Sequence, residues 1–354
     1  MNMKKKPQHA APKKSFCQRW FPCRGDRPGT VVLKILTILF LVVFLVSGYF
    51  LLDELVLKPT AADQSVEELR QEFFPSESES SESSQTDEST AESTVQPDPT
   101  PTPKPIDYAK QLATLQESYP DIVGWIQLSG TVIDYPVLQS DSSDPEYYLY
   151  RNYKSESTKY GSIFASSDSL PFAQCRNSVM YGHSMQDGRM FASLLLFSSL
   201  DTYRACPSIT LYTEEGKSTW KIFSVMKVST KEEHGEYFPF SRTSFSDDDD
   251  FMQYVYGVYQ RSVLDTGVTV REDDELLSLV TCSYEYDGFR TVVVARKVRD
   301  GESSEVDTSK SRYNARVVYP DVWYTNHSGS QPVWTENWRD AVKDGSFSAY
   351  DGNG

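Results

Sequence analysis

The chain has 354 residues, of which 39% are apolar and 13% aromatic, so it can bury a sizeable core in one or two domains. Its formal net charge is −15, and the acidic residues are concentrated beyond the first 34 positions. This distribution argues against a nucleic-acid partner, because an acidic surface repels phosphate groups.

The N-terminal region combines a basic segment with an apolar one. The first 34 residues contain nine Lys or Arg and one acid, Asp26. An uncharged apolar run follows over residues 35–52, and residues 31–33 extend it on the other side of Lys34. A helix of this length spans a bilayer core of about 30 Å.

These features predict a cytoplasmic segment at 1–30 and a transmembrane helix at 31–52 in the plasma membrane. The excess of positive charge before the helix predicts that the rest of the chain lies outside the cell. A cleaved signal peptide is the alternative. It is less favoured because the basic and apolar regions are both long and no A-x-A-like site follows directly.

Residues 53–105 are expected to form a disordered linker. Positions 76–94 are nearly all Ser, Glu, Thr and Asp, and positions 97–105 alternate proline with Thr, Asp and Lys. Such segments bury too little apolar surface to offset the entropy of ordering. The linker is interpreted as a tether that lifts a folded domain off the membrane.

A folded domain is expected from residue 106 to 299. Apolar residues at helical spacing before Pro120 predict a helix near its start. Short β-rich runs separated by turns follow, which favours a closed barrel or a sandwich. Two helices are expected at 190–200 and 247–260, and four aspartates open the second one, where they suit the positive end of the helix dipole.

Three side chains that could take part in catalysis lie at the ends of predicted strands. Cys282 ends the apolar run 276–282, Arg290 precedes the run 291–296, and His183 ends the run 178–183. A structural cysteine and a packed histidine are the alternatives for the first and last of these. However, no other cysteine or histidine beyond the apolar segment ends a predicted core strand.

Several motifs resemble the class B sortases, which are membrane-anchored cysteine transpeptidases of Gram-positive bacteria. The resemblance covers roughly residues 106–298. Its motifs occur in the family's order and are DIVGWI at 121–126, IDYPV at 133–137, YYL at 147–149, GSIF at 161–164, YGHSM at 181–185, DGRMF at 187–191 and TCSYE at 281–285 followed by Arg290. The resemblance implies a mainly β fold, an eight-stranded barrel with an N-terminal helix and an extra helix between strands 6 and 7.

The resemblance also implies a mechanism. Cys282 as thiolate would attack the carbonyl of a Thr in the C-terminal sorting motif of a secreted protein and form a thioacyl-enzyme. His183 would transfer protons to the leaving amine and from the incoming one. Arg290 would stabilise the oxyanion. A peptidoglycan amine would then accept the protein, and no cofactor is expected.

Further site residues are expected around these three. Tyr181 matches a position that lines the substrate groove in the family, with a core aromatic as the alternative. Thr281 and Glu285 are expected to contact the substrate. Glu285 and Asp287 follow the nucleophile closely enough to orient His183 or meet the substrate, but the favoured interpretation of both is an exposed loop carboxylate. Val280 departs from the family, whose members often carry a small polar residue there.

The remaining features are less informative. Residues 300–354 lie outside the resemblance, and three tryptophans predict a loosely ordered extension that docks on the barrel. Cys175 and Cys206 are candidates for a disulfide outside the cell, but their spacing does not demand one. Neither CxxC nor HExxH spacing occurs, so a metal site is not expected.

Alternative functions remain. A pilin-polymerising sortase would use the same residues with a protein lysine as acceptor, and an exported binding domain would need no catalysis. Papain-like hydrolases share the residue types, but their cysteine precedes the histidine, whereas His183 precedes Cys282 here.

Overall fold

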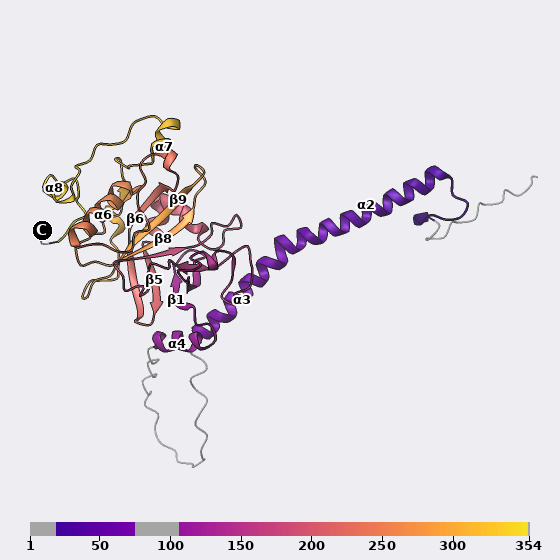
Figure 1. Cartoon of the computed structure of the whole chain (residues 1–354), viewed down its shortest axis with the longest axis horizontal. Coiled ribbons are helices and arrows are strands. Elements are labelled where there is room, and N and C mark those ends of the chain that lie inside the picture. The colour runs from indigo at the N-terminus through magenta and orange to yellow at the C-terminus, as the bar shows by residue number, and fades with distance from the viewer. Residues whose placement is uncertain (1–18, 75–105, 353–354) are drawn as a thin grey trace, which may run out of the picture. The chain divides into compact units, whose positions relative to one another are not determined.

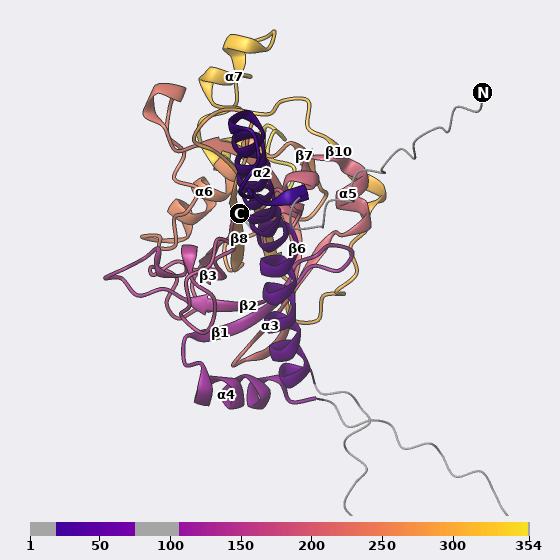
Figure 2. The same ribbon diagram turned by 90° about the vertical axis from the view of Figure 1, so that its right-hand side faces the viewer.

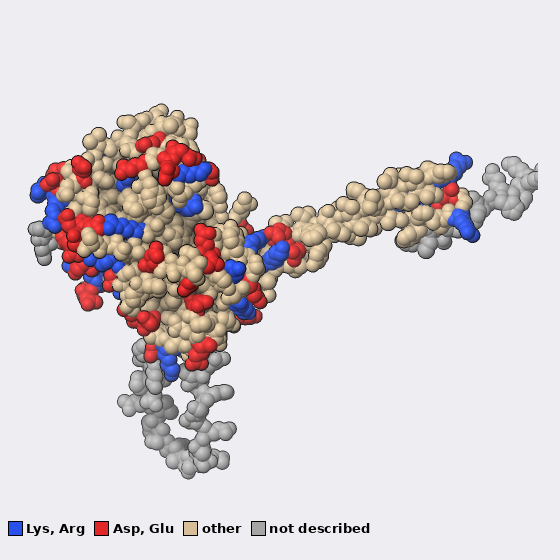
Figure 3. Space-filling view, in the orientation of Figure 1, with Lys and Arg blue, Asp and Glu red and all other residues tan. Residues whose placement is uncertain are grey.

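The computed structural model describes residues 19–74 and 106–352 and divides the chain into two compact units, residues 1–67 and 68–354. The first unit contains the helix α2 (Pro28–Leu52), the π-helical turn η1 (Asp53–Leu57) and the beginning of α3 (Lys58–Phe73). This continuous helical stretch is long and apolar enough to cross a membrane. On the face drawn in Figure 3, the middle of α2 shows no Lys, Arg, Asp or Glu side chains. The one lysine in α2, Lys34, is paired with Asp26 at 2.7 Å.

The second unit is built on strands and short helices (Figure 1). Its strands are β1 (Ile122–Gln127), β2 (Asp134–Gln139), β3 (Ile163–Ala165), β4 (Asn177–Tyr181), β5 (Ser208–Thr213), β6 (Gly216–Ser229), β7 (Leu264–Asp265), β8 (Leu276–Cys282), β9 (Phe289–Lys297) and β10 (Arg312–Tyr313). Its α-helices are α4 (Tyr108–Ser118), α5 (Leu200–Ala205), α6 (Asp248–Arg261), α7 (Asp321–Asn326) and α8 (Trp338–Lys343). Its 3₁₀ helices are η3 (Tyr147–Tyr150), η4 (Ala192–Ser198), η5 (Glu232–His234) and η6 (Thr308–Lys310).

Eight of the strands close into a barrel in the order β1-β2-β3-β4-β8-β9-β6-β5. β2 with β3 and β4 with β8 are parallel pairs, and the other neighbours are antiparallel. The eight-stranded barrel expected from the resemblance is therefore confirmed. The extra helix is also present, because α6 lies between β6 and β8, the sixth and seventh strands of the barrel.

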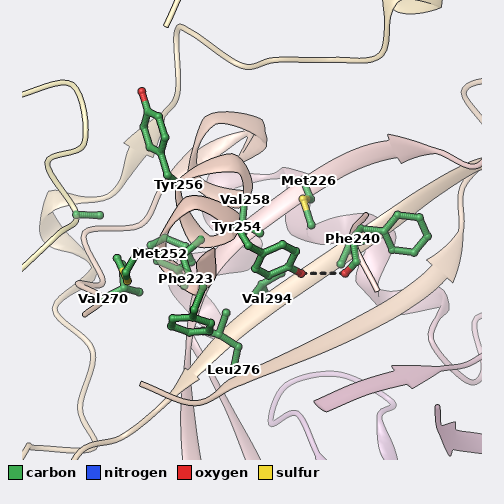
Figure 4. Packing of buried hydrophobic residues seen from close by; sticks show 14 of the residues in the cluster. Phe223, Met226, Phe240, Met252, Tyr254, Tyr256, Val258, Val270, Leu276 and Val294 are labelled. Atoms are coloured by element: carbon green, nitrogen blue, oxygen red, sulfur yellow. Dashed lines mark hydrogen bonds between the residues drawn. The ribbon is translucent and has the colours of Figure 1, made fainter. Parts of the chain in front are cut away.

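The strand β8 is apolar on both faces because both are covered. Leu276 and Val280 belong to a buried cluster with residues of α6, and Leu277 and Leu279, which alternate with them, are fully buried as well. Figure 4 shows α6 packed on the sheet through this cluster, with the Tyr254 hydroxyl donating to the Phe240 carbonyl at 3.0 Å. One face of the β4-β8-β9-β6 sheet is thus covered by α6.

The helix α6 was predicted at 247–260 and is found one residue later. The Asp247 side chain accepts a hydrogen bond from the Asp250 amide and caps the helix. The predicted helix at 190–200 is wrong in its form, because η4 and α5 occupy Ala192–Ser198 and Leu200–Ala205. Ser199 has an extended backbone and separates the two turns.

The predicted linker at 53–105 is contradicted over its first part. The chain is helical as far as Phe73, and Leu69 and Phe73 are buried, 2% and 0% exposed. The Phe73 ring stacks on Trp125 of β1 with centroids 5.4 Å apart. The compact unit consequently begins near residue 68 rather than 106, whereas residues 75–105 of the expected linker lie outside the described chain.

The C-terminal extension is well structured over residues 300–352. β10 pairs with β7, and Trp338 of α8 is 1% exposed against α6. The yellow segment in Figure 1 follows α6 and ends beside it, and Figure 2 shows α7 at the top of the same domain. The expected loosely ordered extension is thus a folded layer over α6.

Candidate active site

Three neighbouring strands bring the expected catalytic side chains together at one end of the barrel. In the parallel pair β4-β8, Tyr181 is opposite Val280. The pairing continues past β4, because the Gly182 amide donates to the Val280 carbonyl at 3.2 Å. His183 and Cys282 follow this pair by two residues on each strand, so they are opposite each other on the same face as Tyr181 and Val280. In the antiparallel pair β8-β9, Cys282 is directly opposite Arg290.

Gly182 is required between Tyr181 and His183. A β-carbon at this position would lie 2.5 Å from the Ile163 side chain and 2.9 Å from the Phe191 ring. The His183 carbonyl also accepts the Phe191 amide at 2.9 Å. The main chain at Gly182 and His183 is therefore in close contact with Ile163 and Phe191.

The imidazole of His183 is half-buried and oriented by the main chain. Its Nε2 lies 2.8 Å from the Leu149 carbonyl oxygen, and because a carbonyl only accepts, Nε2 carries the hydrogen. Among described residues, Nδ1 makes no hydrogen bond and is left for proton transfer. Burial lowers the pKa of His183, and the bond to Leu149 opposes this only in part.

Arg290 provides an unpaired positive charge opposite the cysteine. Its Nη1 donates to the Phe289 carbonyl at 3.0 Å, and within the described ranges no carboxylate forms an ion pair with it. Cys282 itself is a half-buried free thiol. The arrangement places a thiol, an imidazole and a guanidinium on three adjacent strands, a set of groups that is suited to acyl transfer.

Tyr181 lies beside this group. Its half-buried ring packs on Phe164 with centroids 5.7 Å apart and contacts the α6 cluster. Burial raises the pKa of the Tyr181 hydroxyl, while Ser241 and Arg290 act in the opposite direction.

Two residues expected to contact substrate are engaged elsewhere. Thr281 is 2% exposed, and its hydroxyl donates to the Gly182 carbonyl at 2.7 Å, so it joins the two catalytic strands instead of facing substrate. Glu285 forms an ion pair with Lys227 of β6 at 2.6 Å. Burial disfavours its charge most strongly of all single causes, but the Lys227 ammonium and local hydrogen bonds together outweigh it, so the pKa of Glu285 is lowered. Asp287 pairs with Lys231 and is 86% exposed.

Other contacts at the site were missed by sequence reasoning. Tyr150 lies next to His183 with ring centroids 5.2 Å apart, and the Tyr284 hydroxyl donates to the Ser184 carbonyl at 2.7 Å. The Leu149 contact uses only a main-chain oxygen, which leaves no mark in the sequence. The motif YYL at 147–149 was the one available signal for this segment.

Within the described chain, the cysteines outside the site carry no cross-link. Cys175 and Cys206 are both free thiols, and burial raises the pKa of each. The disulfide considered for this pair is absent. Among the residues that the structure describes, no group of three or more His, Cys, Asp or Glu is arranged to hold a metal ion.

Comparison with known proteins agrees with this geometry. A family model described as the sortase domain matches residues 126–298. Sortase B of Listeria monocytogenes is 36% identical over 179 residues, which are 50% of this chain and 69% of that protein. Sortase B of Staphylococcus aureus is 32% identical over 191 residues, or 53% of this chain and 75% of that protein.

A solved structure supports the same assignment. The Staphylococcus aureus sortase B–substrate complex matches with a TM-score of 0.54 and 27% identity, covering 69% of this chain and 99% of that one. The similarity thus extends over most of the length of these relatives and includes the barrel. The chain therefore belongs to the sortase B family and is a cysteine transpeptidase of that type.

Proposed function

We propose that the chain cleaves a C-terminal sorting motif of secreted proteins after Thr, through a thioacyl-enzyme on Cys282. The observation that carries the proposal is the strand register, which aligns His183, Cys282 and Arg290 on three adjacent strands. The Cys282 thiolate adds to the Thr carbonyl carbon. The C–N bond then breaks, and the amine leaves with a proton from His183.

His183 acts through Nδ1, because Nε2 is held by Leu149. Its lowered pKa makes the imidazolium less populated, but a proton on it is given up more readily to the leaving amine. In the second half-reaction the acceptor amine attacks the thioester. Neutral His183 takes the amine proton, and the Cys282 thiolate is released.

Arg290 stabilises the oxyanion formed at the Thr carbonyl. Its guanidinium has no carboxylate partner within the described chain, so its charge is available to the substrate. The amide of Ser283, directly after the nucleophile, already donates to the Phe289 carbonyl at 3.0 Å. Arg290 is thus the better placed donor in this conformation. Tyr181 lines the substrate groove beside it.

The acceptor proposed is a peptidoglycan amine, which would fix the protein to the cell wall. A pilin lysine is the second candidate, since both amines require the same three residues. The non-enzymatic alternative is set aside by membership of the family. We also propose a cell-membrane location with residues 1–30 in the cytoplasm, 31–52 spanning the membrane and the barrel outside. Protease accessibility on intact cells checks this orientation.

Mass spectrometry of the full chain, incubated with a sorting-motif peptide library, tests the chemistry. We expect a thioacyl adduct on Cys282 that disappears in Cys282→Ala and persists in Cys175→Ala, a matched loss of another half-buried thiol. Peptidoglycan peptides and lysine peptides are then offered as acceptors, and the one that resolves the adduct to an amide identifies the function. Absence of any adduct in the wild type would refute the proposal.

A further inference from the structure

The loop between Cys282 and Arg290 is contacted by the C-terminal extension, which lies outside the matched sortase domain. This β8–β9 loop comprises residues 283–288. The Asn326 side-chain amide of α7 donates to the Tyr286 hydroxyl at 3.1 Å. The Trp323 ring meets the Tyr286 ring edge-on with centroids 6.2 Å apart. A segment absent from the family match therefore reaches the loop that joins two site residues.

Tyr286 is connected to Arg290 through Phe289. The Phe289 amide donates to the Tyr286 carbonyl at 3.1 Å, and the two rings lie 4.9 Å apart. The Phe289 carbonyl in turn accepts both the Ser283 amide and Arg290 Nη1, each at 3.0 Å. A displacement of Tyr286 would thus shift the acceptor that holds the Arg290 guanidinium.

The helix α7 is closely packed on its surroundings. Trp323 is stacked between Tyr319 and His327, with centroid distances of 4.3 and 4.0 Å. Gly235, after η5, has a φ of +111°, and a β-carbon there would lie 2.5 Å from the Asp321 carboxylate. The extension therefore offers Tyr286 an aromatic support that is itself packed on both neighbouring rings and against Gly235.

We propose that Trp323 and Asn326 are positioning residues of the transpeptidation reaction. They hold Tyr286, and Tyr286 holds the Phe289 carbonyl that orients Arg290 and the residue after Cys282. The inference rests on the proposed roles of Cys282 and Arg290. It gives the extension a catalytic purpose, because an oxyanion donor is effective only when its direction is fixed before the reaction.

Trp323→Ala in the full chain, solubilised in detergent, tests the inference. Trp334→Ala is the matched control, because Trp334 belongs to the same extension but packs on Tyr256 and Tyr259 of α6. We expect Trp323→Ala to lower kcat for peptide cleavage about tenfold with KM changed less than about twofold, since donor alignment is lost while substrate binding persists. Trp323→Phe should restore most of kcat, and Trp334→Ala should leave kcat unchanged.

Amide hydrogen exchange provides a readout that does not depend on catalysis. Exchange over residues 283–290 should accelerate in Trp323→Ala and stay unchanged in Trp334→Ala. If Trp323→Ala does not fold, Asn326→Ala, at an exposed position, provides the test. It should lower kcat and accelerate exchange over residues 283–290, each to a smaller extent. Equal effects of the two tryptophan variants, or unchanged loop exchange in Trp323→Ala, would overturn the inference. Loss of the proposed chemistry alone would appear as no adduct in the wild type.

Discussion

At His183, the same burial that fixes the ring also sets its protonation. The ring is half-buried between Leu149 and Tyr150, and desolvation disfavours the charged imidazolium. The neutral ring keeps the hydrogen on Nε2 for Leu149, so Nδ1 is the basic atom. The acid form needed for the leaving amine is therefore the minor form at neutral pH.

This protonation predicts how stability depends on pH. The pKa of His183 is lowered from its ordinary value of 6.5 in the folded state, so the unfolded chain binds the proton more readily. The contribution of neutral His183 to the stability of the folded state is complete above the unfolded-state pKa. It is lost as the pH falls through the lower pKa of the folded state. Compared with His183→Gln, the wild type should lose unfolding free energy between about pH 7.5 and about pH 5. Denaturant titrations at the two pH values measure this difference, and a constant difference would contradict it.

The β8–β9 loop carries two carboxylates whose lysine partners differ in how deeply they are buried. Lys227 is 7% exposed and Glu285 is 31% exposed, whereas Lys231 and Asp287 are 35% and 86% exposed. Lys227 also donates to Thr291 at 2.8 Å, and its ammonium is largely removed from solvent. The first pair therefore anchors the loop to β6, and the second is largely solvated.

Glu285→Gln should lower the free energy of unfolding by about 1–3 kcal/mol, because the buried Lys227 charge loses its counter-ion. Asp287→Asn is the matched control and should cause no measurable change. The lowered pKa of Glu285 means that its contribution is present above the ordinary glutamate pKa and is lost as the pH falls through the folded value. The difference between wild type and Glu285→Gln should thus shrink in acid. Denaturation curves of wild type, Glu285→Gln and Asp287→Asn measure these differences. Equal stabilities of the three proteins would contradict the prediction.

The same elements show how far sequence reasoning reached. Apolar runs and a short connection predicted that Cys282 and Arg290 end adjacent strands, because hairpin pairing is local. The pairing of β4 with β8 joins segments that are distant in the sequence, and it was not predicted. The ion pair of Glu285 with Lys227 depends on the β6 register, which no local pattern encodes.

The helical part of the expected linker was missed for a different reason. Its overall composition is polar, yet Val66, Leu69 and Phe73 recur at helical spacing, and the last two are buried. Composition averaged over 53–105 concealed this short amphipathic segment. The three tryptophans of the extension were a valid signal of packing, but their partners, α6 for Trp334 and Trp338 and the β8–β9 loop for Trp323, could not be inferred from spacing alone.

For the whole molecule, the extension and the barrel share one core. Trp338 and Phe347 of the extension lie in the same buried cluster as Phe251 of α6 and Val292 of β9. Arg296 of β9, 1% exposed, is paired with Glu302 of the extension, which also accepts Lys221 of β6 at 2.7 Å. Residues 300–352 are therefore part of the catalytic domain rather than an appended module.

A shared core predicts cooperative unfolding. Trp338 donates from its indole nitrogen to Asp249 at 2.8 Å, so Trp338→Ala leaves a cavity and removes one of the two hydrogen bonds to this carboxylate oxygen, the other coming from Arg339. It should lower the free energy of unfolding by about 3–5 kcal/mol. Val333→Ala in the same extension, at a side chain that is 89% exposed, should change it by less than about 0.5 kcal/mol. In both variants circular dichroism and tryptophan fluorescence should give coincident transitions, because extension and barrel unfold together. An early separate transition in Trp338→Ala, with the barrel signal unchanged, would show instead that the extension is an independent unit.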